Sequence, residues 1–191
     1  MDISVFSDSD YSDTPFGFMI RPEHTTHAML ADWGISHIYA AVRSPQTILD
    51  AGCANGRNTN ILLQRYPRAR ITAAAENSAD AERAVRYNAR EIAEDRCAVI
   101  KADIAELSFP DGYFDLVTAF ENEYIIHNTA CLHEIYRVLK SGGIFAAVTS
   151  FTSPSAPEET AGYLKKAGFV QIKGIVKHKS RWLTITACKG A

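Results

Sequence analysis

From residue 47 onward, short apolar runs alternate with longer amphipathic segments, and this alternation is typical of repeated β-α units. The pattern predicts strands over residues 47–50, 70–75, 97–101, 113–120, 144–150, 169–177 and 181–188. It predicts helices over residues 57–66, 78–94, 129–140 and 157–167, the third of them ended by Gly142 and Gly143. The inner strands are continuous apolar runs, as expected for strands buried on both faces of a parallel sheet. We therefore expect a doubly wound α/β sheet with right-handed crossovers.

The end of the chain breaks the parallel pattern. Only a few residues separate the strand at 169–177 from the strand at 181–188. So short a connection permits only an antiparallel pair. We expect a parallel sheet that ends in an antiparallel hairpin.

The N-terminal segment carries a different pattern. It predicts a short helix over residues 24–32, ended by Gly34, and a second helix over 37–42 that Ser36 caps. We expect one domain overall, with residues 1–44 as a helical lid segment and residues 45–191 as the ligand-binding domain. The alternative is that the N-terminal helix packs on the sheet for stability.

A glycine-rich turn follows the first strand directly: Asp50-Ala51-Gly52-Cys53-Ala54-Asn55-Gly56. Glycines let the backbone turn tightly and let a ligand approach the main chain, and ligands of open α/β sheets bind at this end of the strands. The spacing is not that of the dinucleotide fingerprint. The Asp50 carboxylate would repel a pyrophosphate and attract an ammonium group.

Two further acids end the next two strands. Glu76 follows the second strand, where a carboxylate can accept hydrogen bonds from a ribose diol. Asp103 follows the third strand, where an acceptor suits the amine of adenine and the neighbouring Ile104 suits the face of the ring. Any one of these acids alone is more often a helix cap or a solvated loop residue. Three at successive strand ends, after a glycine turn, predict one ligand site.

These stretches together resemble class I S-adenosylmethionine-dependent methyltransferases. The matching segments are ILDAGCANG, Glu76, KADIAELSFPDGYFDLVTAF and EIYRVLKSGGIF, and HAMLADWGISHI from His27 is similar to the N-terminal stretch of a bacterial subgroup. The resemblance implies a Rossmann-like three-layer sandwich with a seven-stranded, mostly parallel sheet of order 3-2-1-4-5-7-6 and an antiparallel strand 7. It also implies S-adenosyl-L-methionine as the cofactor and a small molecule as the methyl acceptor.

The resemblance further implies the cofactor-binding residues, with Glu76 on the ribose and Asp103 with Ile104 on the adenine. The full set is Asp50, Gly52, Cys53, Ala54, Asn55, Gly56, Glu76, Asn77, Asp103, Ile104, Phe120 and Glu121. Ala54 departs from the family pattern, because many members have a second glycine there. Alanine resists positive φ, so we expect either ordinary backbone angles at Ala54 or weaker cofactor binding.

Methyl transfer from a sulfonium needs alignment and exclusion of water more than it needs a catalytic group. The segment after the fourth strand should face the methyl group, and Glu123 and His127 are its candidate catalytic residues. The candidate acceptor contacts are Met19, His24, His27, Trp33 and Tyr124. The alternatives are a helix-terminal acid for Glu123, core packing for Tyr124 and a helix cap for His127. His24 and His27 would share a helix face, but no further ligands can be placed, so we expect no metal.

The composition limits the classes of partner that we expect. The net charge of −2 shows no basic surplus, so we expect no nucleic-acid partner, and the local run of Lys173, Lys177, Lys179 and Arg181 fits a solvated edge. No apolar run is long enough to span a membrane, and four scattered cysteines suit reduced thiols in the cytoplasm. Two other functions stay open: a nucleotide-binding protein of this fold without turnover, and an NAD(P)-dependent oxidoreductase. Asp50 and the final hairpin speak against the oxidoreductase.

Overall fold

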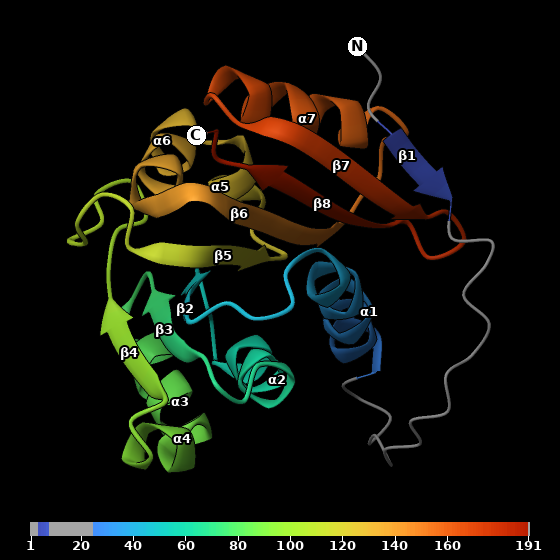
Figure 1. Cartoon of the computed structure of the whole chain (residues 1–191). Helices are drawn as coiled ribbons and strands as arrows, with labels where there is room; N and C mark the ends of the chain where they lie inside the picture. The colour runs from blue at the N-terminus through green and yellow to red at the C-terminus, as the bar shows by residue number, and fades with distance from the viewer. Residues whose placement is uncertain (1–3, 8–24, 191) are drawn as a thin grey trace.

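A computed structural model describes residues 4–7 and 25–190 of the chain. Its sheet has the order β1-β7-β8-β6-β5-β2-β3-β4 (Figure 1). The strands are β1 (Ser4–Ser7), β2 (Thr47–Ala51), β3 (Arg70–Ala75), β4 (Cys97–Lys101), β5 (Phe114–Phe120), β6 (Leu139–Ser150), β7 (Val170–Lys177) and β8 (Trp182–Cys188). Counted from β2, this is the expected order 3-2-1-4-5-7-6, and β8 is antiparallel to both neighbours. The one addition is β1, which pairs in parallel with β7 at the sheet edge.

Helices cover both faces of the sheet, so the expected three-layer sandwich is confirmed. They are α1 (Thr25–Ala41), α2 (Arg57–Arg65), α3 (Ser78–Tyr87), α4 (Ala89–Ala93), α5 (Glu123–His127), α6 (Thr129–Val138) and α7 (Ala156–Lys166). In Figure 1, α1 to α4 lie below the sheet and α5 to α7 above it. No described helix is both long and apolar enough to cross a membrane.

The central strand β5 shows why its sequence is apolar throughout. Successive side chains of a strand point to opposite faces. Leu116 therefore joins the core under α1 and α2, while Val117 joins the core under α6 with Ile135. Both residues are fully buried.

The expected pair of N-terminal helices is wrong, because α1 runs unbroken through Gly34. Gly34 does not end the helix; it lets the helix lie directly on β6. A Cβ at this position would come 2.4 Å from Cγ2 of Val148. The side chains of Leu30, Ile35 and Ile38 are buried in the same interface. The lid role of residues 1–44 stays a prediction, since residues 8–24 lie outside the described part.

Two other helices differ clearly from expectation. The helix predicted over 78–94 divides at Asn88, whose buried Nδ2 donates to the carbonyl oxygens of Gly56, at 3.0 Å, and of Ala84, at 3.1 Å. The α6 helix ends at Val138, before Gly142 and Gly143, because Leu139 is already extended and pairs with Phe114.

Candidate cofactor site

The turn between β2 and α2 requires glycine at two places. Gly52 has φ of +71° and Gly56 has φ of +80°, both in the left-handed region. A Cβ on Gly52 would lie 2.4 Å from Nδ2 of Asn122, and one on Gly56 would lie 2.6 Å from Nδ2 of Asn88. The backbone N–H of Cys53 donates to the carbonyl of Ala74 at 2.9 Å, which fixes the turn to β3. The turn is thus a rigid main-chain surface.

Ala54 adopts the conformation that alanine resists. Its φ is +46°, so the expectation of ordinary backbone angles is wrong. The left-handed conformation costs a non-glycine residue about 1–2 kcal/mol. The turn therefore keeps the shape that a glycine would give it, at a cost in stability.

Asp50 lies beneath this turn. Its side chain is buried, with the residue 1% exposed, and it accepts hydrogen bonds from the hydroxyls of Thr59 at 2.6 Å and Thr118 at 3.2 Å. Burial raises the pKa of the Asp50 carboxyl to about 6, and the two hydroxyl donors only partly oppose this shift. The carboxylate thus bonds to α2 and β5 beside the turn and is not accessible to solvent.

The raised pKa of Asp50 predicts a pH-dependent cost in stability. A carboxyl group that binds its proton more tightly in the folded state destabilises that state as pH rises from about 4 to about 6. The cost above pH 6 is about 3 kcal/mol. Because part of this cost is already present at pH 4, the difference in unfolding free energy between wild type and Asp50→Asn should shift by about 2 kcal/mol, against the wild type, between pH 4 and 7. Urea unfolding at each pH measures it, and a constant difference would contradict it.

An open cavity of 560 Å³ lies at the ends of β3 and β4. Its lining residues are Glu76, Lys101, Ala102, Asp103, Ile104 and Tyr124. The two acids are exposed, whereas Ile104 is buried. The volume is within the range of about 300–1,000 Å³ of small-molecule sites. The structure thus brings together the acids that the sequence placed at two strand ends.

The charges of both acids also affect a buried thiol nearby. Burial, together with the negative charges of Asp103 and Glu76, raises the pKa of Cys131 to about 11. Cys131 lies in the first turn of α6, beneath the cavity.

Asn122 joins the cavity to the glycine turn, and the sequence analysis missed it. Its Oδ1 accepts from the backbone N–H of Ile125 at 3.1 Å and so caps α5. Its Nδ2 donates to Oε1 of Glu76 at 3.0 Å. Lys101 and Ala102 were missed as well, although Lys101 precedes Asp103 by two positions and could have been inferred from strand periodicity.

A second contact lies at the end of β5. Nδ1 of His27, in the first turns of α1, lies 2.6 Å from Oε2 of Glu121. Glu121 follows β5 directly and has φ of +48°. The contact ties α1 to the strand end next to Asn122.

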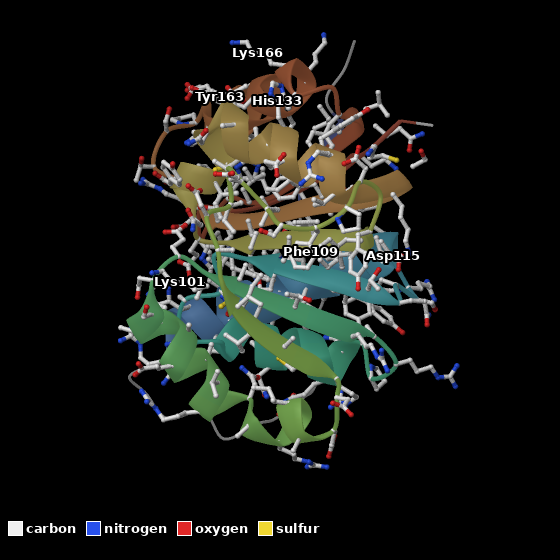
Figure 2. All side chains as sticks on the ribbon, turned by 90° about the vertical axis from the view of Figure 1, so that its left-hand side faces the viewer. Lys101, Phe109, Asp115, His133, Tyr163 and Lys166 are labelled. Atoms are coloured by element: carbon white, nitrogen blue, oxygen red, sulfur yellow. The ribbon has the colours of Figure 1, made fainter. Side chains whose placement is uncertain are left out.

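The proposed catalytic residues lie away from the cavity. Glu123 is exposed in the first turn of α5, and the ring of His127 lies 5.1 Å from that of Tyr163 on α7. Neither lines the cavity. Figure 2 shows Tyr163 over α7, well apart from Lys101 at the end of β4. Their catalytic roles remain predictions.

The remaining expected residues are placed as follows. Trp33 packs against Trp182, with ring centroids 5.8 Å apart, and Phe120 is buried in the same core. Asn77 caps α3 by accepting from the N–H of Asp80, and Asn55 accepts from that of Arg57. Met19 and His24 lie outside the described residues. Within residues 4–7 and 25–190, no group of three His, Cys, Asp or Glu side chains could hold a metal.

The sequence between residues 48 and 143 matches the family model described as a methyltransferase domain. The chain belongs to this family, within the class I S-adenosylmethionine-dependent superfamily. Among curated relatives of this chain, the sterol 24-C-methyltransferase of Pneumocystis carinii is 31% identical over 58% of the chain and 29% of the relative. The cycloartenol-C-24-methyltransferase of Arabidopsis thaliana is 29% identical over 69% of the chain and 39% of the relative. The chain thus spans about a third of the length of these relatives.

Solved structures agree on the fold. An S-adenosyl-L-methionine-dependent methyltransferase of Methanococcus maripaludis, described as putative, superimposes with a TM-score of 0.75 at 19% identity, over 87% of this chain and 88% of that one. Human N-acetylserotonin methyltransferase in complex with SAM gives a TM-score of 0.67 at 18% identity, over 87% of this chain and 55% of the human chain. A [4+2]-cyclase, SpnF, gives 0.69 at 16% identity, over 85% and 81%. At these identities the likeness shows the fold, and the cyclase shows that the fold alone does not set the reaction.

Proposed function

We propose that this methyltransferase binds S-adenosyl-L-methionine and transfers its methyl group to a small-molecule acceptor. The observation that carries the proposal is the cavity that Glu76 and Asp103 both line and that Asn122 connects to the glycine turn. Family membership supports the same reaction.

The residues present fit the donor. Glu76 offers a carboxylate to a ribose diol, and Asp103 offers one to the adenine amine. One oxygen of Asp103 also accepts from the N–H of Ala105 at 2.9 Å, which fixes the side chain in place. The turn from Gly52 to Gly56, whose two glycines have positive φ, offers main chain to the methionine part. The bound donor supplies an activated methyl group, and the protein's part is to orient it and exclude water.

We assign Tyr124 to binding of the methyl donor, whereas the sequence suggested a contact with the methyl acceptor. It is 61% exposed and lines the cavity together with the buried Ile104. A large aromatic ring exposed inside a nucleotide cavity is suited to pack on adenine. Ile104 and Tyr124 then supply the two apolar contacts of the base.

This assignment makes a prediction for Tyr124. Tyr124→Ala should weaken binding of S-adenosylhomocysteine about fivefold to tenfold, because an aromatic contact is worth about 1 kcal/mol. Tyr124→Phe keeps the ring and should bind within about twofold of the wild type. Isothermal titration calorimetry measures both, and equal losses in the two variants would assign the effect to the hydroxyl.

We do not propose that this chain shares the methyl acceptors of the sterol methyltransferases. Those proteins have about two thirds of their length without a counterpart here. A small molecule is the acceptor class that we propose, and we expect no nucleic acid and no membrane as partners.

Calorimetry and labelled methyl transfer test the proposed function together. S-adenosylhomocysteine should bind the purified chain and NADH should not. Donor labelled in the methyl group should then pass its label to a component of a metabolite extract. Binding without any transfer would favour a nucleotide-binding protein without turnover, and binding of NADH in place of S-adenosylhomocysteine would favour an oxidoreductase.

A further inference from the structure

A histidine and a glutamate form a close pair beside the glycine turn. Nδ1 of His27 lies 2.6 Å from Oε2 of Glu121, although the two residues are 94 positions apart. The His27 side chain is 82% exposed and that of Glu121 is 28% exposed. The ring is therefore held at one nitrogen and open to solvent over most of its surface.

The backbone at Glu121 is held in an unusual conformation. Its φ of +48° is costly for a residue with a side chain, while its N–H donates to the carbonyl of Val148 at 2.8 Å. Strained residues of this kind cluster at functional sites. Gly34, one and a half to two turns along α1 from His27, holds the helix against that same Val148. Packing of α1 on β6 therefore sets the position of His27 over Glu121.

The strand order places this pair beyond the nucleotide cavity. Adjacent strands run β4, β3, β2, β5 across the sheet. Asp103 follows β4, Glu76 follows β3, the glycine turn follows β2 and Glu121 follows β5. A ligand with adenine at β4 and ribose at β3 extends its remaining atoms over β2 toward β5. His27 and Glu121 lie at the far end of that path.

The pairing also decides which nitrogen carries the proton. An ionised carboxylate only accepts hydrogen bonds, so Nδ1 of His27 is the donor. In a neutral imidazole the other nitrogen, Nε2, then carries a lone pair. This is the arrangement of a histidine general base held by a carboxylate. His127, in contrast, has an aromatic ring beside it on α7.

We infer that His27 is the general base of methyl transfer, that Glu121 positions it, and that the acceptor atom carries a proton, as in a phenolic hydroxyl. This inference rests on the proposed function. The acceptor oxygen forms a bond to the methyl carbon, and the carbon–sulfur bond breaks with its electron pair left on sulfur. The hydroxyl proton passes to Nε2 of His27 and later to water. The Glu121 carboxylate stabilises the imidazolium in between. A carboxylate acceptor would need no such base.

The test compares two ligands and needs no known acceptor. Sinefungin carries an amino group on the atom that replaces the methylated sulfur, and S-adenosylhomocysteine has no group there. With a water molecule in the place of the acceptor atom, the amino group should reach Nε2 of His27 through that water, so the wild type should bind sinefungin at least tenfold more tightly. His27→Ala should bring the affinity ratio close to one and leave the S-adenosylhomocysteine affinity within about twofold, and Glu121→Gln should lower the ratio as well. His133→Ala, at an exposed histidine on α6, is the matched control (Figure 2).

The outcomes of the calorimetry distinguish the assignment of His27 as the base from the proposed function. An unchanged ratio in His27→Ala overturns the base assignment and leaves the proposed function intact. Loss of S-adenosylhomocysteine binding in His27→Ala alone also overturns it, because the pair would then hold the donor. Failure of the wild type to bind S-adenosylhomocysteine overturns the proposed function itself. Nitrogen-15 NMR of the imidazole at neutral pH gives a second readout: a proton on Nε2 and none on Nδ1 would overturn the inference.

Discussion

Glu76→Ala is expected to weaken S-adenosylhomocysteine binding about 100-fold. The variant loses the carboxylate that we assign to the ribose diol, and two hydrogen bonds to a charged acceptor are together worth about 3 kcal/mol. Glu76→Gln retains one acceptor oxygen and should lose about tenfold. Calorimetric titration of the two variants measures both effects.

Two controls make the Glu76 result specific. Glu106→Ala removes an exposed carboxylate on the segment after β4 that does not line the cavity, and its affinity should match that of the wild type. Asn122→Ser retains an oxygen that can cap α5 but cannot reach Glu76. Its affinity should fall by no more than about threefold. A loss as large as that of Glu76→Ala would mean that Glu76 acts by ordering Asn122 and not by binding the ribose.

Gly34→Ala is expected to lower the free energy of unfolding by about 2 kcal/mol. The added Cβ would lie 2.4 Å and 2.5 Å from the two γ-carbons of Val148, so α1 has to move away from β6. Overpacking of this kind costs about 1–3 kcal/mol or more, which exceeds the gain in helix propensity of about 1 kcal/mol. Urea unfolding at neutral pH measures the difference.

Another helical glycine provides the matched control. Gly162 lies in α7, and a Cβ there would have nothing within 4 Å. Gly162→Ala should therefore raise the free energy of unfolding by about 0.5–1 kcal/mol. Val148→Ala in the Gly34→Ala background should recover part of the lost packing. If Gly34→Ala were as stable as Gly162→Ala, α1 would not be held in close contact with β6.

Local patterns predicted the strands and the nucleotide cavity because those features depend on residues close in sequence. Each acid directly follows the apolar run that carries it, and parallel strands bring such ends to one edge of the sheet. The alternation of strands and helices predicted a parallel sheet, while the order of its seven main strands followed from the resemblance to class I S-adenosylmethionine-dependent methyltransferases, and the structure confirms both.

Contacts between distant segments could not be predicted in the same way. Gly34 looks like a helix terminator until Val148 is placed against it. The pairing of His27 with Glu121 joins a helix and a strand end that no sequence pattern connects. The choice of His127 as a catalytic candidate followed its position after the fourth strand, whereas the orientation of α5 sets its ring beside Tyr163.

The N-terminal strand β1 has a consequence for shortened forms of this protein. Ser4–Ser7 occupies hydrogen-bonding groups along β7 that would otherwise face solvent. A chain cut back to residue 25 would keep Glu76, Asp103 and His27 but would present an uncovered strand edge, to which other polypeptides can add. Truncation should therefore be judged by self-association in concentrated solution, where the loss of the four residues of β1 would matter more than any change in the cavity.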